Sequence, residues 1–217
     1  MISWAFFKCT SLEGIVIPST VKVIGKQAFG YCTMLRWVEL CEGLERIDPG
    51  AFSECTWLEG IVIPSTVKVI GQRAFDGCTM LRDIKLCEGL EHIDPWAFYN
   101  CTSLEGIIVP SNLKGIGEGT CFGCTRNSLV ELREGLEEIH ERAFSLCKSI
   151  QQISIPSMVK YIATDAFDFC DGSVEIIFSS GVKFLLEVSL PEWLVADGIC
   201  KLPEKYHVSS AQYSNPL

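Results

Sequence analysis

Apolar and polar positions repeat along this chain with a fixed period of 23 residues. In seven of eight units an Ala-Phe pair stands just ahead of a cysteine, and the sixth unit has Thr120-Cys121 instead. The cysteines that mark the period are Cys9, Cys32, Cys55, Cys78, Cys101, Cys124, Cys147 and Cys170. A constant period of this length is typical of a solenoid, in which similar coils stack on one another.

Each unit predicts one short strand. Leu58, Ile61 and Ile63 have the spacing L-x-x-L-x-L, and Pro64 ends the strand because it cannot donate to a ladder. At the same phase we expect strands near 12–17, 35–40, 58–63, 81–86, 104–109, 127–132, 150–155 and 173–178. Asp-Pro pairs at 48–49 and 94–95 indicate an N-cap with proline at the first helical position, which predicts one helical or 3₁₀ turn per coil.

The predicted fold is therefore an α/β repeat solenoid. We expect a horseshoe or arc with a parallel β-sheet on its concave face and short helical or 3₁₀ turns on its convex side. The solenoid covers residues 1–178, in about eight units of which the first is incomplete. Residues 179–217 leave the period, and they predict a C-terminal cap, with a short helix at 191–196, and a loose tail.

A second period of 46 residues contains the first. Residues 15–60 and 61–106 align without gaps and are identical at 34 of 46 positions, which indicates duplication of a two-coil unit. Residues 23 apart stack about 4.8 Å apart on neighbouring coils. Two such columns alternate in charge, and we expect their members to attract between coils and to oppose a slip by one coil rather than to form a binding stripe. The first column consists of Lys22, Glu45, Lys68, Glu91, Lys114, Glu137 and Lys160. The second consists of Glu13, Arg36, Glu59, Arg82 and Glu105.

The recurring phrase I-P-S-x-V-x-x-I-G-x-x-A-F-x-x-C-x-x-L resembles the BspA-type leucine-rich repeat. It runs here from Ile17 to Leu35 and again from Ile63 to Leu81. The resemblance covers about residues 4–178. It implies the leucine-rich-repeat fold and a role in binding, since members of that family include microbial surface proteins that bind host proteins or other cells.

Charge and hydropathy narrow the classes of partner. The net charge is −9 and the pI about 4.9, and a chain without a basic patch is a poor candidate for nucleic acid. No apolar run approaches the roughly 20 residues of a membrane helix, so no membrane partner is expected. No signal peptide is visible at the N-terminus, which favours the cytoplasm over the cell surface, although a mature secreted protein or a fragment has the same appearance.

The cysteines follow the core phase, which predicts small buried thiols. Disulfides between adjacent coils are the alternative, because one coil spacing is at the low end of the accepted Cα separation. Cys121 and Cys124 form a lone C-x-x-C pair, which suggests a thiol-based enzyme as a third hypothesis; no second pair completes a zinc site. His92 and His140 are expected to face solvent. We predict no catalytic residue, no metal and no cofactor.

The outward positions of the strands are the candidate binding surface. Its predicted residues are Val16, Trp37, Glu39, Val62, Lys85 and Ile108. Trp37 lies between Gly14 and Gly60 on neighbouring coils, so it either anchors a partner or covers the bare backbone of these glycines. We expect a non-enzymatic protein-binding scaffold that uses the concave face for adhesion or recognition, with another protein as partner. The alternative is a structural element that associates end-on with itself through the N-terminal coil, where Trp4-Ala5-Phe6 lacks a polar cap.

Overall fold

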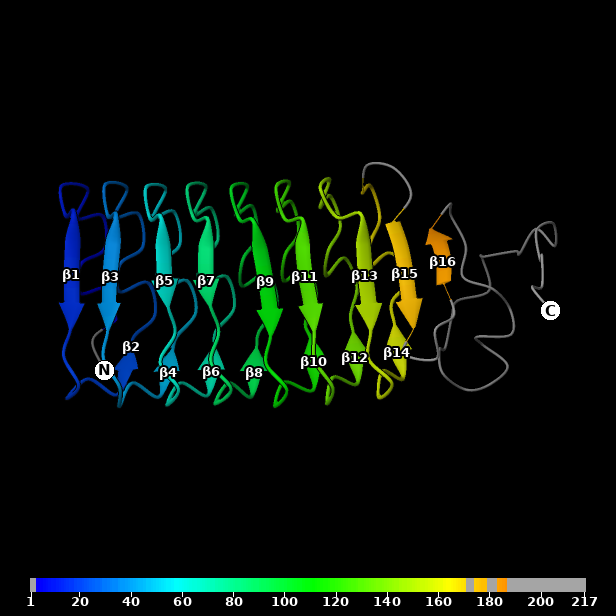
Figure 1. Ribbon diagram of the computed structural model, residues 1–217. Coiled ribbons are helices and arrows are strands. Elements are labelled where there is room, and N and C mark those ends of the chain that lie inside the picture. Colours follow the sequence, from blue (N-terminus) through cyan, green and yellow to red (C-terminus); the bar gives the residue numbers. More distant parts are fainter. Residues whose placement is uncertain (1–2, 171–173, 179–182, 187–217) are drawn as a thin grey trace, which may run out of the picture.

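The computed structural model is a solenoid of about seven turns, and Figure 1 shows its long strands side by side in a nearly straight row. The structure describes residues 3–170, 174–178 and 183–186. The predicted helix at 191–196 and loose tail lie outside the described residues.

One long strand per coil forms the first row. Residues 23 apart are opposite one another in parallel pairs, as Gly14 and Trp37 are. Paired strands and the neighbours β7 with β9 and β11 with β13 continue the row along the molecule. The strands are β1 (Gly14–Ile17), β3 (Trp37–Leu40), β5 (Gly60–Val62), β7 (Asp83–Lys85), β9 (Gly106–Val109), β11 (Leu129–Leu132), β13 (Gln152–Ile155) and β15 (Val174–Phe178).

These strands confirm the predicted ones, but each begins one or two residues later. Leu35, the first apolar residue of its motif, still belongs to the preceding turn, since its N–H donates to the carbonyl of Cys32 at 3.0 Å. At the last coil β16 (Lys183–Leu186) pairs with β15 in the antiparallel direction.

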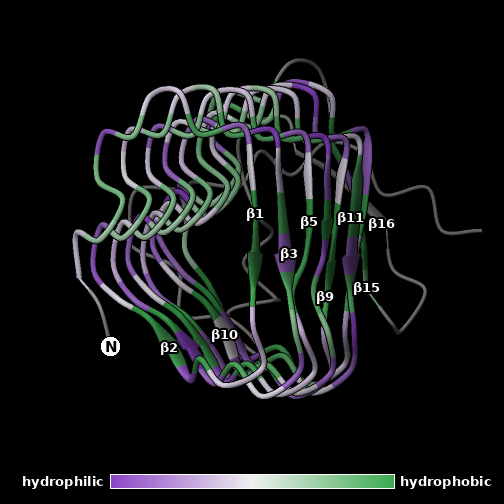
Figure 2. Ribbon diagram, turned by 90° about the vertical axis from the view of Figure 1, so that its left-hand side faces the viewer, coloured by the Kyte–Doolittle hydropathy of each residue, from purple (hydrophilic) through white to green (hydrophobic). Residues whose placement is uncertain are grey.

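A second row of two-residue strands was not predicted. It consists of β2 (Val23–Ile24), β4 (Arg46–Ile47), β6 (Val69–Ile70), β8 (His92–Ile93), β10 (Gly115–Ile116), β12 (Glu138–Ile139) and β14 (Tyr161–Ile162). The paired members are parallel, and Figure 2 shows β2 and β10 on a different side of the coil from the long strands. Two residues are too few to give an alternating pattern, so the sequence carries no strand signal there.

The predicted helical or 3₁₀ turns are wrong, because the described residues contain no helix. The Ala-Phe-x-x-Cys segment is a series of turns in which alternate N–H groups take different acceptors. Ala28 N–H donates to the carbonyl of Gly25 within the coil at 3.1 Å, whereas Phe29 N–H donates to that of Ala51 in the next coil at 2.8 Å. An α-helix would need consecutive N–H groups for its own i→i−4 bonds, so the bonds between coils exclude it.

The interior is a set of stacked columns. The rings of Phe29 and Phe52 lie 5.2 Å apart and 4° from parallel, and this stack runs from Phe6 to Phe98. The sixth coil interrupts the stack, because Cys121 takes the place of phenylalanine in the core. Phe122, one residue later, instead stacks on Tyr99 at 5.3 Å. The irregular unit thus keeps its place in the solenoid with a different core residue.

The cysteine column is built into this interior. From Cys32 on, each thiol of the column donates to a carbonyl 26 residues earlier, as Cys55 does to Phe29 at 3.1 Å and Cys78 to Phe52 at 3.2 Å. Among the described residues the cysteines are free thiols. Burial raises the pKa of Cys32 to about 11. These contacts support the interpretation that the column consists of structural thiols.

Candidate binding face

All six predicted binding residues lie on the outer side of the long strands, here called the strand face. Successive side chains of a strand point to opposite faces, so Val38 and Ile61 enter the core while their neighbours stay outside. The exposed residues are Val16, Trp37, Glu39, Val62, Lys85 and Ile108, which confirms their predicted exposure.

Trp37 is the largest of these side chains and remains 51% exposed. Its indole ring lies across the preceding coil, because a Cβ atom on Gly14 would stand only 2.0 Å from Cε2 of the ring. A Cβ atom on Gly60 would meet only Asp83, at 3.5 Å or more, and would not touch the indole. Trp37 therefore covers Gly14, as one interpretation expected, but leaves Gly60 open.

The charge column beside Trp37 differs from the prediction. Arg36 does not form an ion pair with Glu13 or Glu59; its guanidinium lies over the ring of Trp57, 4.6 Å from the centroid. Within the described part of the chain no ion pair joins two members of this column. The expected ion pairs along this column are therefore wrong, and for Arg36 the reason is that the face of Trp57 holds the cation.

A rim of exposed apolar side chains at the entrance of the long strands was also missed. Met34, Trp57 and Met80 are 23 residues apart and between 38% and 46% exposed. The signal was present in the sequence, since the same column can be read at the fixed period. The rim extends the apolar character of the strand face around the second to fourth coils.

The other charge column forms the predicted pairs. Lys22 and Glu45 are 3.5 Å apart, and Lys68 and Glu91 are 2.9 Å apart. Further along, Glu137 contacts two lysines, at 3.5 and 2.7 Å. Counting the coil of β1 as the first, the pairs of Lys22, Lys68 and Lys114 join an odd-numbered coil to the following even-numbered coil. The pair of Glu137 with Lys160 joins an even-numbered coil to the following odd-numbered one. The charges of this column are thus paired with opposite charges on neighbouring coils, as expected if the column fixes the register between coils.

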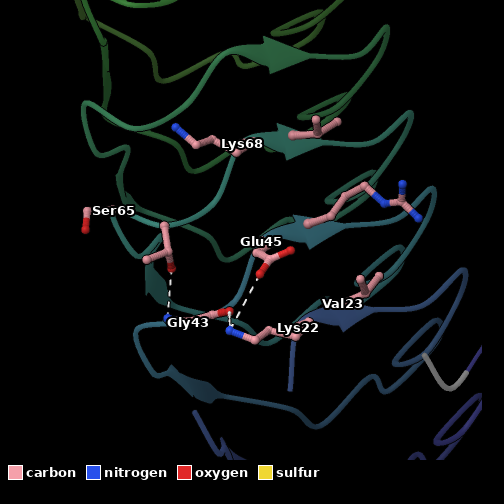
Figure 3. Close-up of a pocket in the computed structure, with 9 residues that line it drawn as sticks. Lys22, Val23, Gly43, Glu45, Ser65 and Lys68 are labelled. Carbon is pink, nitrogen blue, oxygen red and sulfur yellow. Dashed lines mark hydrogen bonds and ion pairs between the residues drawn. The ribbon is translucent and has the colours of Figure 1, made fainter. Parts of the chain in front are cut away.

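The turn between the long and the short strand of each coil, which carries this charge column, is here called the corner of the coils. An open hollow lies there, lined by Lys22, Gly43, Glu45, Ser65 and Lys68 among others (Figure 3). Lys22 donates to the carbonyl of Gly43 at 3.1 Å in addition to its pairing with Glu45. The remaining cations are engaged too: Arg46 with Asp48 at 2.7 Å and Lys68 with Glu91. Because its cations are already paired, this hollow is part of the scaffold rather than an anion site.

A second set of contacts, not predicted, joins even-numbered coils to the following odd-numbered ones. Glu42 accepts hydrogen bonds from the N–H and the hydroxyl of Ser65, at 3.2 and 3.0 Å. Glu88 accepts in the same way from Ser111, and Glu134 from Ser157. The N–H of Ser65 is the main cause that lowers the pKa of Glu42. Lys-Glu and Glu-Ser contacts therefore alternate over the first six coils, and only between the sixth and seventh coils do both occur together, as Glu137–Lys160 and Glu134–Ser157. This alternation gives the 46-residue period a physical basis.

The two ends of the solenoid differ. At the N-terminal coil an apolar groove of about 330 Å³ is lined by core-type side chains, among them Phe6, Val21 and Phe29. Trp4, in the coil predicted to lack a polar cap, packs edge-on against Phe7 at 4.7 Å and is 50% exposed. At the other end β16 covers the edge of β15.

The family model for the BspA type leucine rich repeat region matches residues 1–126 and 93–187, in six copies. The chain belongs to the BspA-type leucine-rich repeat family. This confirms the resemblance given by the recurring phrase. Proteins of this family are generally protein-interaction or surface scaffolds without enzymatic activity.

Solved structures agree with this assignment. The chain is 34% identical to the leucine-rich repeat protein of T. pallidum, with a TM-score of 0.64, over 68% of this chain and 69% of that one. A leucine-rich repeat protein of Eubacterium ventriosum is 26% identical, with a TM-score of 0.65, over 73% of this chain and 43% of that one. A leucine rich cell surface protein of Faecalibacterium prausnitzii, 24% identical with a TM-score of 0.55 over 81% and 62%, shares the fold. No curated protein matches the chain.

The C-x-x-C pair of this BspA-type chain lies in the core. The contact of Cys121 with Cys124 lowers the pKa of Cys121, but burial and neighbouring thiols outweigh it and raise the pKa overall. Burial raises the pKa of Cys124 well above its usual value. A redox or nucleophilic thiol needs access and a lowered pKa. Neither condition holds for these two thiols, so the third hypothesis gains no support.

Metal ligands, histidines and membrane-spanning helices are the other features of the described part of this BspA-type chain that bear on its function. It holds no cluster of three or more His, Cys, Asp or Glu side chains arranged to bind a metal ion. His92 is exposed as predicted, whereas His140 is partly buried, with its Nε2 atom 3.0 Å from Glu138. No helix among these residues is long and apolar enough to cross a membrane.

Proposed function

We propose that this chain is a non-enzymatic scaffold that binds another protein through its strand face, with Trp37 as the anchor. The observation that carries the proposal is a half-exposed indole on the same face as two other exposed apolar side chains, Val16 and Val62, which lie one outward position further along the adjacent strands. Tryptophan is enriched among the residues that dominate binding energy at protein interfaces. Isolated exposed apolar residues are common, but several of them on one face of the same few strands favour an interaction site.

The rigidity of the scaffold supports the same proposal. Residues of the strand face stand on strands held in register by hydrogen bonds and by the Lys-Glu and Glu-Ser contacts between coils. A preorganised surface loses little conformational freedom when it binds. Glu39 lies beside the anchor, Lys85 and Ile108 lie two and three strands away on the same face, and together they set which partner fits, through charge and shape.

The test compares two variants at the same position of the repeat. Trp37→Ala removes the anchor, and Leu129→Ala removes the exposed side chain that lies over Gly106 four coils away. We expect a protein captured by the wild-type chain and by Leu129→Ala to be lost by Trp37→Ala. The thermal midpoints of the three proteins should be nearly equal. A large fall in the midpoint of Trp37→Ala with no loss of captured protein would show that Trp37 is structural.

The apolar groove at the N-terminal coil favours a second candidate function, end-on association between copies of this chain. Phe6, 39% exposed, lines that groove beside core residues of the first two coils. We expect the mass of the chain in light scattering to rise with concentration, and Phe6→Ser to keep it monomeric. A wild-type chain that stays monomeric across the series rejects this candidate and leaves the strand-face proposal untouched.

A further inference from the structure

The surroundings of Trp37 are acidic, and the exposed lysine of the strand face, Lys85, lies two strands away, beyond Val62. Glu39 lies on the same side of the same strand, and Glu13 and Glu59 lie on the two adjacent coils. All three side chains are exposed, and within the described residues none of them forms an ion pair. The nearest cation of the column, Arg36, is held over Trp57 at 4.6 Å.

This arrangement contrasts with the Lys-Glu column at the corner of the coils. There each carboxylate has a cation from a neighbouring coil, so the repeat satisfies its own charges. Around Trp37, by contrast, the carboxylates of Glu13, Glu39 and Glu59 form no ion pair with a cation of the described residues. Their charge is available to a second molecule, and the net charge of −9 adds to the attraction of a basic partner.

The bare backbone of Gly60 leaves room for a side chain next to the strand of Trp37, and this space is here called the hollow. Gly60 is the register partner of Trp37 on the next strand and presents no side chain. Because an added Cβ atom would make only ordinary contacts there, at 3.5 and 3.9 Å, the space above the backbone is open. Val62, 57% exposed, forms an apolar wall two residues further along the strand.

We infer that the partner presents a basic segment to this place. The inference rests on the proposed function and names the chemistry of its partner. A lysine or arginine side chain lies over the indole of Trp37, where the ring attracts a cation and the three carboxylates surround its charge. An aliphatic side chain next to it in the same segment enters the hollow over Gly60 and packs against Val62.

The experiment uses the full chain and two labelled peptides as probes. One peptide alternates arginine, leucine and serine, and its matched partner has glutamate in place of arginine. We expect the basic peptide to raise the fluorescence anisotropy signal at low salt, with binding weakened at high salt, and the acidic peptide not to bind. Trp37→Ala should weaken binding about tenfold or more, and Glu39→Gln about threefold.

Two further variants separate a specific site from general charge attraction. Gly60→Val fills the hollow with a side chain whose Cβ atom meets no backbone atom closer than 3.5 Å, and it should weaken binding while the thermal midpoint is unchanged. Leu129→Ala should bind like the wild type. Equal binding of the acidic peptide, or binding of the basic peptide that Trp37→Ala and Gly60→Val leave unaltered, overturns the inference.

The failure of this inference is distinguishable from failure of the proposed function. If capture of a protein requires Trp37 but is insensitive to Glu39→Gln and to salt, the strand face binds a partner that is not basic. In that case the proposed function stands and the inference falls. If neither capture nor peptide binding depends on Trp37, both are wrong.

Discussion

The corner of the coils and the strand face are made from the same 23-residue units, yet their charged groups differ. Those at the corner have partners on neighbouring coils, whereas the carboxylates near Trp37 on the strand face form no ion pair within the described part of the chain. At the corner Glu42 receives two hydrogen bonds from Ser65, and Lys22 contacts both Glu45 and the carbonyl of Gly43. On the strand face Glu39 has no ion-pair partner among the described residues. Repetition alone therefore does not decide whether a charge is structural. What decides it is whether the neighbouring coil offers a partner.

The cysteines give the largest expected difference between groups with and without such a partner. Cys55 and Cys78 are buried and donate to carbonyls of the preceding coil, whereas Cys9 in the first coil is exposed. Burial raises the pKa of Cys55 and Cys78, which suppresses the reactive thiolate. We expect Cys9 to be alkylated at least about a hundredfold faster than either in the native chain, because the buried thiols react only through opening of the fold.

Mass spectrometry after timed alkylation measures these rates residue by residue. Denaturant should make all cysteines react at similar rates. Rapid native alkylation of Cys121 or Cys124 would contradict the buried positions of these thiols and restore the thiol-enzyme hypothesis.

Two glycine substitutions test whether the backbone is more closely packed at the corner of the coils than on the strand face. Gly135 at the corner has a φ of +111°, and its added Cβ atom would stand 2.1 Å from the carbonyl oxygen of Ser111. We expect Gly135→Ala to lower the free energy of unfolding by about 2 kcal/mol. Gly60→Ala on the strand face meets no obstacle and should lie within about 0.5 kcal/mol of the wild type. Urea unfolding of both variants checks the difference, and equal losses would contradict the contrast between corner and face.

Acid should weaken the corner contacts. The N–H of Ser65 lowers the pKa of Glu42, the hydroxyl of Ser111 that of Glu88, and Lys160 that of Glu137. A carboxylate whose pKa is lower in the folded chain stabilises the fold above its unfolded pKa, and this contribution disappears as the pH falls through the folded value. We expect the thermal midpoint to fall on the acid side of the usual carboxyl range.

Replacing these three glutamates by glutamine should lower the midpoint at neutral pH and flatten its dependence on acid. Ser65→Ala, which removes only the hydroxyl donor to Glu42, should flatten it slightly. A triple variant with the same acid slope as the wild type would show that other groups control the transition.

The smallest effect is expected at Arg36. Removing its guanidinium from the ring of Trp57 should cost about 0.5–1 kcal/mol, since the pair is exposed. Glu13→Gln and Glu59→Gln should not change that cost in a double-mutant cycle, because neither carboxylate contacts Arg36. A measurable coupling energy would show that the second charge column acts as a ladder after all.

Much of the scaffold could be predicted from the sequence, because its main signals are local and repeat in register. The motif from Leu58 to Ile63 predicts the long strand, and the alternation of Lys22 and Glu45 predicts their pairing. The turns could not be predicted in the same way. Asp48-Pro49 has the local features of a helix start, but bonds such as that from Phe29 N–H to Ala51 depend on the next coil.

The candidate site shows the same limit. Exposure of Trp37 follows from its place in the strand, whereas its tilt toward Gly14 and away from Gly60 depends on contacts between coils. The sequence offered no means to choose between Glu13 and Trp57 as the partner of Arg36. Whether the guanidinium contacts a carboxylate or an aromatic ring depends on distances and on the orientation of the ring. The order of residues in the repeat does not give either of them.

The alternation of Lys-Glu and Glu-Ser contacts also restricts how a gene of this kind can lengthen or shorten. Loss of the third coil alone, for example, would place Glu45 beside Glu91 and Glu42 beside Glu88, so that acids face acids at the new junction. Loss or gain of two coils restores every partner. Recombination between repeats should therefore yield foldable chains in steps of 46 residues, and relatives that differ in length are expected to differ by whole two-coil cassettes.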